Sequence, residues 1–412
     1  MHHFQYREGQ LWAENIPVER LAEEFGTPLY VYSAATLRRH FEAFDSAFHN
    51  LPHLTCYSVK ANSNIHLLEL LGKQGAGMDI VSGGELYRAL AAGVPGEKIV
   101  YSGVGKKANE IREALNAGIL MFNVESMAEL ERINEVALSM DTRARVSFRI
   151  NPDVDPQTHP YISTGMRDNK FGLDVRHSLL AYERARKLPG IEPVGIDCHI
   201  GSQLTSIAPF LEALEKIKDF HQQLVEMGIT ITYLDLGGGL GITYDEEVPP
   251  KPDEFGAALA RSLHGLPLTL ILEPGRVIAG NAGILVTEVL YTKQTPSKKF
   301  LIVDAAMNDL IRPALYQSFH RISEVTPHCR DKERVDVVGP ICESSDFLAR
   351  GRSLPEVLQG ERLAVFSAGA YGFAMSSNYN SRPRAAEVLV DGDTAILARR
   401  RETYEDLVAA ER

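Results

Sequence analysis

Eight short apolar runs alternate with helix-like segments between residues 50 and 275, and this alternation is the strongest constraint on the fold of the chain. The runs are rich in valine, isoleucine and aromatic residues, and several helix-like segments end near a glycine, as helices often do. Strands that alternate with helices predict a parallel sheet, and eight such units predict a (β/α)8 barrel. The apolar runs span residues 54–59, 77–81, 98–102, 119–123, 145–150, 194–200, 231–236 and 268–273.

Helix-like segments between the runs include residues 66–73, 85–92, 108–116, 127–138 and 210–227. In such barrels the active site forms at the face where the strands end. Residues at the ends of separate runs are therefore expected to converge, and these are Lys60, Asp79, Asn123, Arg149, His199, Gly237 and Glu273. A stretch at 151–172 is too long for a simple connection and is expected to be mobile or to cover the site.

The pattern changes at about residue 283, where strand-like runs follow one another with few helices between them. Such a pattern predicts a separate antiparallel β domain, a sandwich or a barrel. The runs span residues 284–291, 299–304, 334–339, 362–367, 386–390 and 395–399. We expect a segment at 1–32 that joins this β domain through residues 29–32, a barrel at 33–280, and the β domain at 281–412.

Bulk composition restricts the class of protein. Acidic residues number 54 and basic residues 43, a balance of −11 that disfavours nucleic-acid binding. No apolar run approaches the length of a membrane span, and the N-terminus lacks a hydrophobic signal core. The four cysteines, at irregular spacing, fit neither a disulfide framework nor a zinc site. These features predict a cytoplasmic protein without a bound metal.

Lys60 follows an apolar strand in the sequence Tyr-Ser-Val-Lys-Ala-Asn. Taken alone, such a lysine is most simply a solvated surface cation. At a barrel mouth, however, a desolvated lysine can lose its proton and bond to an aldehyde. A second short segment, Glu273-Pro274-Gly275-Arg276, ends another strand and supplies a carboxylate able to bind a pyridine nitrogen. Together the two segments favour pyridoxal phosphate (PLP) as cofactor.

Two further segments fit this interpretation. Gly237, Gly238 and Gly239 lack the third glycine of a dinucleotide-binding fingerprint, so we expect them to form either a simple tight turn or a cradle for one phosphate. His199, where a strand gives way to glycine, is either a core histidine or a flat ring that stacks on the cofactor, with Ser202 near the phosphate.

The predicted β domain contains three weaker candidates. Arg312 and Tyr316 lie four residues apart, on one face if helical, and Pro313 would make that helix short. The sequence Cys342-Glu343-Ser344-Ser345-Asp346 places a thiol beside two carboxylates. Tyr371 is an aromatic residue bordered by glycine in an expected loop. The simpler interpretations are an amphipathic helix, a buried cysteine and a packing tyrosine.

Taken together, these motifs resemble the fold-type III PLP-dependent decarboxylases over residues 30–391, without a departure at a position that the family needs. The resemblance implies that Lys60 holds PLP covalently, that His199 stacks on its ring and that Glu273 binds its nitrogen. The residues expected to hold the cofactor are Lys60, Asp79, His199, Ser202, Gly237, Gly238, Gly239, Glu273, Pro274, Gly275, Arg276 and Tyr371.

The resemblance also implies the rest of the site. Cys342 would be the proton donor, delivered by the partner subunit of an obligate homodimer with shared active sites. The residues expected to contact substrate are Arg276, Arg312, Tyr316, Glu343 and Tyr371. Because Arg312 offers a bidentate partner for a distal carboxylate and Glu343 a partner for a distal amine, we expect decarboxylation of meso-2,6-diaminopimelate to L-lysine.

Other interpretations remain open at this point. Related enzymes act on ornithine, arginine or carboxynorspermidine. Alanine racemase has a similar architecture but requires an arginine at the ring nitrogen, which Glu273 argues against. A PLP-binding regulator without catalysis would not need the β domain, Cys342 or the Arg312 segment, and an inactive homologue would be expected to lose the lysine or the glycine turn.

Overall fold

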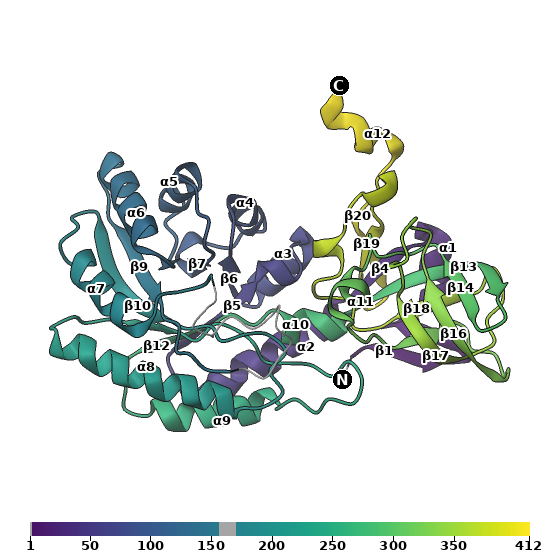
Figure 1. The fold of residues 1–412 in the computed structure, drawn as a ribbon, viewed down its shortest axis with the longest axis horizontal. Helices are drawn as coiled ribbons and strands as arrows, with labels where there is room; N and C mark the ends of the chain where they lie inside the picture. The colour runs from purple at the N-terminus through teal and green to yellow at the C-terminus, as the bar shows by residue number, and fades with distance from the viewer. Residues whose placement is uncertain (1, 156–169) are drawn as a thin grey trace. The chain divides into compact units, whose positions relative to one another are not determined.

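Eight parallel strands close into a barrel in one unit of the chain, which comprises Phe41–Ile242 and Val248–Val277 (Figure 1). The computed structural model describes residues 2–155 and 170–412. Each strand pairs with the next along the chain, and the last pairs with the first. The strands are β5 (His53–Ser58), β6 (Gly77–Ile80), β7 (Ile99–Tyr101), β8 (Met121–Val124), β9 (Ala144–Arg149), β10 (Ile191–Asp197), β11 (Tyr233–Asp235) and β12 (Thr269–Leu272).

The predicted (β/α)8 barrel is confirmed, since every predicted run overlaps one barrel strand. The largest difference in bounds is at β10, which begins at Ile191 although the prediction begins at residue 194. Pro193 obscured that start because proline normally interrupts a strand. The structure accommodates the proline at a register shift between Pro193 and Gly195 in the pairing of β10 with β9.

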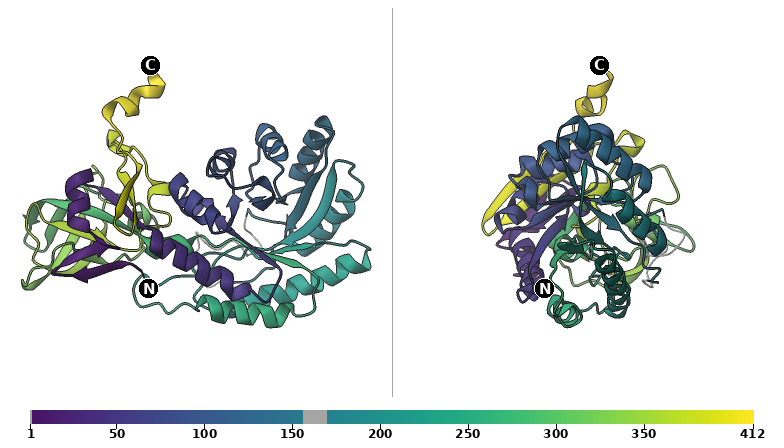
Figure 2. Two further views of the ribbon diagram at one scale, coloured as in Figure 1. Left: turned by 180° about the vertical axis from the view of Figure 1, so that it is seen from behind. Right: turned by 90° about the vertical axis from the view of Figure 1, so that its left-hand side faces the viewer.

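Helices lie around the strands of this unit, as the right-hand view of Figure 2 shows. Several begin where a short polar side chain replaces a missing backbone acceptor. The side chain of Asn64 caps α3, that of Ser82 caps α4 and that of Ser126 caps α6. The helices are α3 (Ile65–Lys73), α4 (Gly83–Ala91), α5 (Ala108–Asn116), α6 (Met127–Ser139), α7 (Val175–Ala185), α8 (Ala208–Glu226) and α9 (Pro252–Leu263).

The barrel interior changes character along its length. One end holds an apolar cluster that includes Cys56, Val100, Met121 and Ile271. The burial of these side chains stabilises the barrel by about 1.5–3 kcal/mol for each large residue. Toward the ends of the strands, buried polar side chains replace the apolar ones, Asp79 and Asn123 among them. The strand ends are therefore built for chemistry rather than for packing alone.

The second unit, Met1–His40, Thr243–Glu247 and Ile278–Arg412, is built on a nine-stranded sheet. Its main path runs β17-β16-β14-β13-β4-β19-β20, and β15 and β18 join through β13. The sheet strands are β4 (Leu29–Ser33), β13 (Gly283–Gln294), β14 (Lys299–Val303), β15 (Ile322–Glu324), β16 (Lys332–Val338), β17 (Ala349–Pro355), β18 (Arg362–Val365), β19 (Ala386–Asp391) and β20 (Thr394–Arg399).

The remaining elements are short. A three-stranded sheet holds β1 (Phe4–Arg7), β2 (Gln10–Ala13) and β3 (Ile16–Pro17). The short helices are α1 (Val18–Phe25), α11 (Arg312–Tyr316) and α12 (Tyr404–Val408), and the unit boundaries fall within α2 (Ala34–Asp45) and α10 (Arg276–Ala279). No helix in the described parts of the chain is long and apolar enough to cross a membrane.

The predicted antiparallel β domain is confirmed for most strand pairs of the large sheet, but two pairs are parallel. β4 runs parallel to β19, and β14 runs parallel to β16. β4 enters from the segment before the barrel, so no hairpin fixes its direction. β14 reaches β16 through a connection that contains α11 and β15, which is long enough for a parallel crossover. The sheet is therefore mixed.

The packing of α9 generates a stability prediction. A Cβ atom at Gly256 would lie 2.3 Å from the backbone oxygen of Ala47, whereas one at Gly84 in α4 would meet nothing closer than 3.8 Å. Helix propensity favours alanine over glycine by about 1 kcal/mol, but overpacking costs about 1–3 kcal/mol. We expect Gly256→Ala to lower the free energy of unfolding in urea and the control Gly84→Ala not to lower it. Equal effects would contradict the close approach of α9.

Candidate active site

Backbone hydrogen bonds tie together the turns that follow β5, β10, β11 and β12. The amide of Glu273 donates to the carbonyl of Gly237 at 2.8 Å, and the amide of Ser58 donates to that of Pro274 at 3.0 Å. The amide of Leu204 donates to the carbonyl of Gly239 at 2.9 Å. Predicted motifs that lie far apart in sequence, at 58–60, 199–203, 237–239 and 273–276, therefore meet at one end of the barrel.

The glycine turn requires glycine for two separate reasons. Gly237 has a φ of +62°, a left-handed conformation that side chains disfavour. A Cβ atom at Gly238 would lie 2.2 Å from the backbone oxygen of Glu273. The turn thus packs its backbone directly against the segment that carries Glu273. The sequence alone could not show this close approach, because three successive glycines also fit an ordinary tight turn.

Lys60 lies in a single 3-10 turn, Val59–Ala61, immediately after β5. Its Nζ atom is 2.6 Å from Oδ2 of Asp79, whose side chain is fully buried. The hydroxyl of Ser58 lies 2.7 Å from the same oxygen and 3.0 Å from the carbonyl of Glu273. The other carboxylate oxygen of Asp79, Oδ1, is buried and has no hydrogen-bond partner among the described residues. Asp79 thus positions the lysine amine and keeps an unsatisfied acceptor beside it.

Glu273 is buried and bonded to side chains from two neighbouring strand ends. Its Oε1 atom accepts from the hydroxyl of Ser102 at 3.2 Å and from Nδ2 of Asn123 at 3.4 Å. Nδ2 of Asn123 also lies 3.0 Å from Oδ2 of Asp235. Burial raises the pKa of Glu273 well above its ordinary value, and the charges of Asp235 and Asp79 add to the effect. A cationic partner would reverse that shift.

Two more carboxyl groups share this environment. Burial raises the pKa of Asp235 to about 7, and the charge of Asp197 adds to the shift. Burial also raises the pKa of Asp197 well above its ordinary value, with the charge of Glu273 as the second cause. The barrel interior therefore holds more carboxyl groups than it can ionise together, so it favours a cation or additional protons.

His199 lies two residues beyond the end of β10. Its Nδ1 atom accepts a hydrogen bond from the amide of Gly238 at 3.2 Å, which places the proton of the neutral ring on Nε2. Burial lowers the pKa of His199 well below 6.5, and the charges of Arg149 and Lys60 lower it further. The side chain is thus a neutral, flat ring held against the glycine turn.

Two arginines reach the same end of the barrel. Nη2 of Arg276 donates to the hydroxyl of Ser202 at 3.0 Å, which brings together two residues predicted to lie near a phosphate. Nη1 of Arg149 is 3.0 Å from a carboxylate oxygen of Glu125, and both side chains are buried. The pair is a structural support, because the charge of the arginine is already balanced.

The predicted residues of the second unit lie in three places. Arg312 and Tyr316 are the first and last residues of α11, so the prediction of a short helix there is confirmed. Arg312 is buried, its Nη1 atom lies 3.1 Å from Nε2 of His320, and its guanidinium lies 4.6 Å from the ring centre of Tyr244. Nδ1 of His320 lies 2.8 Å from the carbonyl of Phe366, which leaves Nε2 to accept from the arginine.

Cys342 and Glu343 lie in an exposed loop after β16, and the thiol is free. The carboxylate of Glu343 accepts from the hydroxyls of Ser345 and Tyr379 at 2.6 and 2.8 Å. Tyr371 lies in a loop after β18 and has a left-handed backbone, with φ of +55°. The expectation of a loop at Tyr371 is confirmed, and the thiol is not buried.

Several residues of the site escaped sequence analysis. Ser102, Asp235 and Asn123 bond with Glu273 or with one another, yet only Asn123 was expected at the barrel mouth. His320 and Tyr379 hold predicted residues but stand in segments without a motif. A signal existed for Asp235, which directly precedes Leu236 and the glycine turn at the end of a predicted strand.

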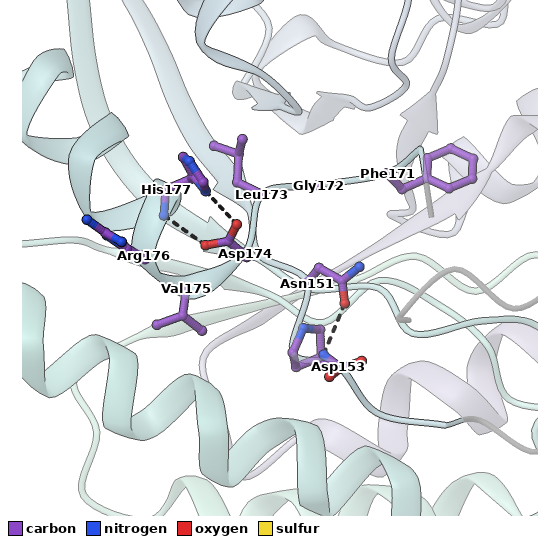
Figure 3. A pocket seen from close by; sticks show the side chains of 10 residues that line it. Asn151, Asp153, Phe171, Gly172, Leu173, Asp174, Val175, Arg176 and His177 are labelled. Carbon is purple, nitrogen blue, oxygen red and sulfur yellow. Dashed lines mark hydrogen bonds and ion pairs between the residues drawn. The ribbon is translucent and has the colours of Figure 1, made fainter. Parts of the chain in front are cut away.

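A separate hollow of about 670 Å³ is lined by residues 151–153 and 171–177 (Figure 3). Asp174 and His177 face each other there, but Oδ1 of Asp174 accepts from the backbone amide of His177 at 3.0 Å and so caps α7. None of the predicted site residues lines the hollow. The predicted loop 151–172 is described only at 151–155 and 170–172, and its residues 156–169 lie outside the described range.

The residues at the barrel mouth fit PLP on three observations. A lysine amine stands beside a buried carboxylate that has a spare acceptor. Glu273 is buried and its pKa is raised, so a cation beside it would stabilise its ionised form. A glycine turn too crowded for side chains lies beside Ser202 and Arg276. Amine, carboxylate and backbone cradle are the three groups by which proteins hold this cofactor.

Comparison with known proteins gives consistent matches. Residues 34–280 match the family model of the pyridoxal-binding domain of pyridoxal-dependent decarboxylases. The diaminopimelate decarboxylase of Haemophilus influenzae is 54% identical over 100% of this chain and 99% of its own. Two solved structures are similar throughout. That of diaminopimelate decarboxylase from M. jannaschii has a TM-score of 0.95 at 41% identity, covering 100% and 98% of the two chains. The structure of the Helicobacter pylori enzyme, complexed with L-lysine, has a TM-score of 0.93 at 43% identity, and the match covers 96% of this chain and 99% of the other.

The buried carboxyl groups predict an unusual pH dependence. Because the pKa of Asp235 is raised from 3.8 to about 7 in the folded chain, the stability that this residue contributes is present below pH 4 and is lost as the pH rises through 7. We expect the unfolding free energy of the cofactor-free protein, measured in urea, to fall between pH 5 and 8. The unfolding free energy of Asp235→Asn should fall less over that pH range. Parallel curves for the two proteins would contradict a protonated Asp235.

Proposed function

The chain belongs to the diaminopimelate decarboxylase family of fold-type III, pyridoxal-dependent decarboxylases, and we propose that it converts meso-2,6-diaminopimelate to L-lysine and CO2 at the mouth of its barrel. The observation that carries this proposal is the meeting of Lys60, Glu273 and the glycine turn on turns joined by backbone hydrogen bonds. When bound, PLP supplies an electron sink that accepts the electron pair left behind by the departing carboxylate.

Lys60 is the residue proposed to bond covalently to the cofactor and to release the product. Its amine is held by Asp79 at 2.6 Å, and that carboxylate is fixed in turn by Ser58. As the pair separates, Asp79 can accept the proton that the amine must lose to become a nucleophile. The turn Val59–Ala61 fixes the backbone from which the lysine side chain extends.

Glu273 is proposed to hold a proton on the pyridine nitrogen. Burial raises the pKa of the glutamate well above its ordinary value when no cation faces it, so burial favours the protonated form. A basic nitrogen beside it could take that proton, and the resulting ion pair would be shielded from water. Ser102 and Asn123 would then donate to the ionised carboxylate and keep it in place.

The remaining barrel contacts are proposed for orientation. His199 presents a neutral ring to the cofactor face, because Gly238 fixes its Nδ1 atom. Gly237, Gly238 and Gly239, with Ser202, Pro274, Gly275 and Arg276, are proposed to hold the phosphate end. Tyr371 is assigned to the same end, and to the substrate, from the family resemblance.

Substrate selection is proposed to depend on charge. Arg312 presents its planar fork to the distal carboxylate, and His320 and the ring of Tyr244 hold that fork in one orientation. Glu343 contacts the distal amine, and Arg276 and Tyr316 complete the substrate contacts. A site with paired charges penalises a substrate that leaves one of them unpaired, which disfavours ornithine and arginine.

Cys342 is proposed to return a proton to the α-carbon after CO2 leaves. Following the family pattern, the thiol that serves one barrel is Cys342 of the partner subunit, so the active form is a homodimer. L-Lysine, seen in the related Helicobacter pylori structure, is the expected product ligand. Because the donor must remain a thiol, we propose a reducing, cytoplasmic setting.

The reaction is tested by CO2 release. Purified protein loaded with PLP is incubated with diaminopimelate, lysine, ornithine and arginine in turn, and CO2 is measured. We expect CO2 release from diaminopimelate at a rate at least tenfold above that with any other compound. Equal or greater release from ornithine would overturn the substrate assignment and leave the decarboxylation mechanism standing.

The role of Arg312 gives a kinetic prediction. Arg312→Leu removes the partner of the distal carboxylate, so KM for diaminopimelate should rise more than tenfold, at least ~1.4 kcal/mol. Arg312→Lys, which keeps the charge without the fork, should give an intermediate KM. Steady-state kinetics with unchanged KM in Arg312→Leu would remove the basis for the substrate assignment.

A further inference from the structure

The loop that carries Cys342 and Glu343 is held at its base by a buried carboxylate. Oδ2 of Asp346 accepts from the amide of Ile341 at 2.8 Å, and its Oδ1 accepts from the amide of Met307 at the same distance. A Cβ atom at Gly339 would lie 2.6 Å from this carboxylate. The base of the loop is therefore tightly packed, whereas Cys342 and Glu343 at its tip are exposed.

A second segment of the same unit contacts that tip. This segment is the turn Tyr379–Ser381, whose backbone is not helical at Asn380. Oδ1 of Asn380 accepts from the amide of Cys342 at 2.9 Å, and the hydroxyl of Tyr379 donates to Oε2 of Glu343 at 2.8 Å. Adjacent residues of the turn thus hold adjacent residues of the loop, one through the backbone and one through the side chain.

The turn has its own anchors, so it can act as a fixed support. Nδ2 of Asn378 lies 2.6 Å from a carboxylate oxygen of Glu402, and that carboxylate also binds the guanidinium of Arg384. Nη2 of Arg382 donates to the backbone oxygen of Asp304 at 3.0 Å. Both the loop base and the turn are therefore attached to the β unit independently of each other.

The backbone of the turn also explains its residue types. Asn380 and Ser381 have φ of +55° and +54°, in the left-handed region. Asparagine tolerates this conformation better than most residues with a side chain. At position 380 it supplies a left-handed turn and a hydrogen-bond acceptor together, whereas glycine would supply only the turn.

We propose that Tyr379 and Asn380 are positioning residues for the decarboxylation, with separable tasks: Asn380 sets the backbone that carries the Cys342 thiol, and Tyr379 sets the carboxylate of Glu343. The inference rests on the proposed function, in which the thiol returns a proton and the glutamate binds the distal amine. Ser345 completes the second task, since its hydroxyl donates to the other oxygen of Glu343. With both oxygens fixed, Glu343 presents one orientation to a cation.

The two tasks predict different kinetic signatures. A misplaced thiol slows the proton return without weakening substrate binding, so Asn380→Gly should lower kcat about fivefold or more and leave KM within about twofold. A loosened Glu343 weakens the grip on the distal amine, so Tyr379→Phe should raise KM about fivefold and leave kcat within about twofold. A general loss of folding would not divide the two parameters in this way.

A measurement independent of activity tests the Asn380 contact directly. Hydrogen exchange of the Cys342 amide is followed by mass spectrometry in the PLP-loaded protein. Asn380→Gly keeps the left-handed turn but removes the acceptor, so this amide should exchange about tenfold faster or more. Asn380→Asp keeps an acceptor oxygen and tolerates the same backbone, so it should retain the protection and restore most of kcat.

Matched controls complete the experiment. Asp141→Gly alters another left-handed residue, in the loop between α6 and β9, and Tyr404→Phe removes the hydroxyl of an exposed tyrosine. Neither should change kcat, KM or exchange at Cys342. Unchanged exchange in Asn380→Gly, or equal changes of kcat and KM in both test variants, would overturn the inference.

The reference variants Cys342→Ala and Glu343→Gln separate this outcome from failure of the proposed function. If both retain normal kinetics, the assigned roles of the thiol and the glutamate are wrong, and the exchange result then stands only as a structural contact.

Discussion

The ion pair between Lys60 and Asp79 is the interaction on which the rest of the barrel mouth depends. Asp79, Asp197, Asp235 and Glu273 are all buried, and an isolated buried carboxylate costs several kcal/mol unless it is paired or protonated. Lys60 supplies the nearest positive charge to Asp79, at 2.6 Å. Among the described residues the other three carboxyl groups form no ion pair of this kind, and burial raises the pKa of each of them, which favours their protonated forms.

That balance explains why the cofactor and the barrel suit each other. Burial raises the pKa of Glu273, and a protonated pyridine nitrogen beside it would stabilise the ionised carboxylate. The charge would then be spread over an ion pair supported by Ser102 and Asn123. The glycine turn contributes in a different way, because its backbone packs against the carbonyl of Glu273. The position of the carboxylate and the shape of the turn are therefore set by the same contact.

Sequence reasoning succeeded where a residue's position follows from strand periodicity. Lys60 directly follows one apolar run and Glu273 ends another, and parallel strands must bring such ends together. Periodicity could not predict the buried hydrogen bonds around Glu273, because Ser102 and Asp235 act through contacts between strands distant in sequence. Nor could periodicity set the parallel pairing of β4 with β19 or distinguish an exposed thiol from a buried one. The roles of the site residues therefore remain predictions.

We propose a covalent bond between the amine of Lys60 and pyridoxal phosphate, at a barrel mouth where Glu273 would face the ring nitrogen. It is tested most directly by loading the protein with the cofactor, reducing it with borohydride and mapping the modified peptide by mass spectrometry. The loaded protein should show a visible absorbance that reduction removes, and the only modified residue should be Lys60. A label on another lysine, or no visible absorbance in fully loaded protein, would contradict it.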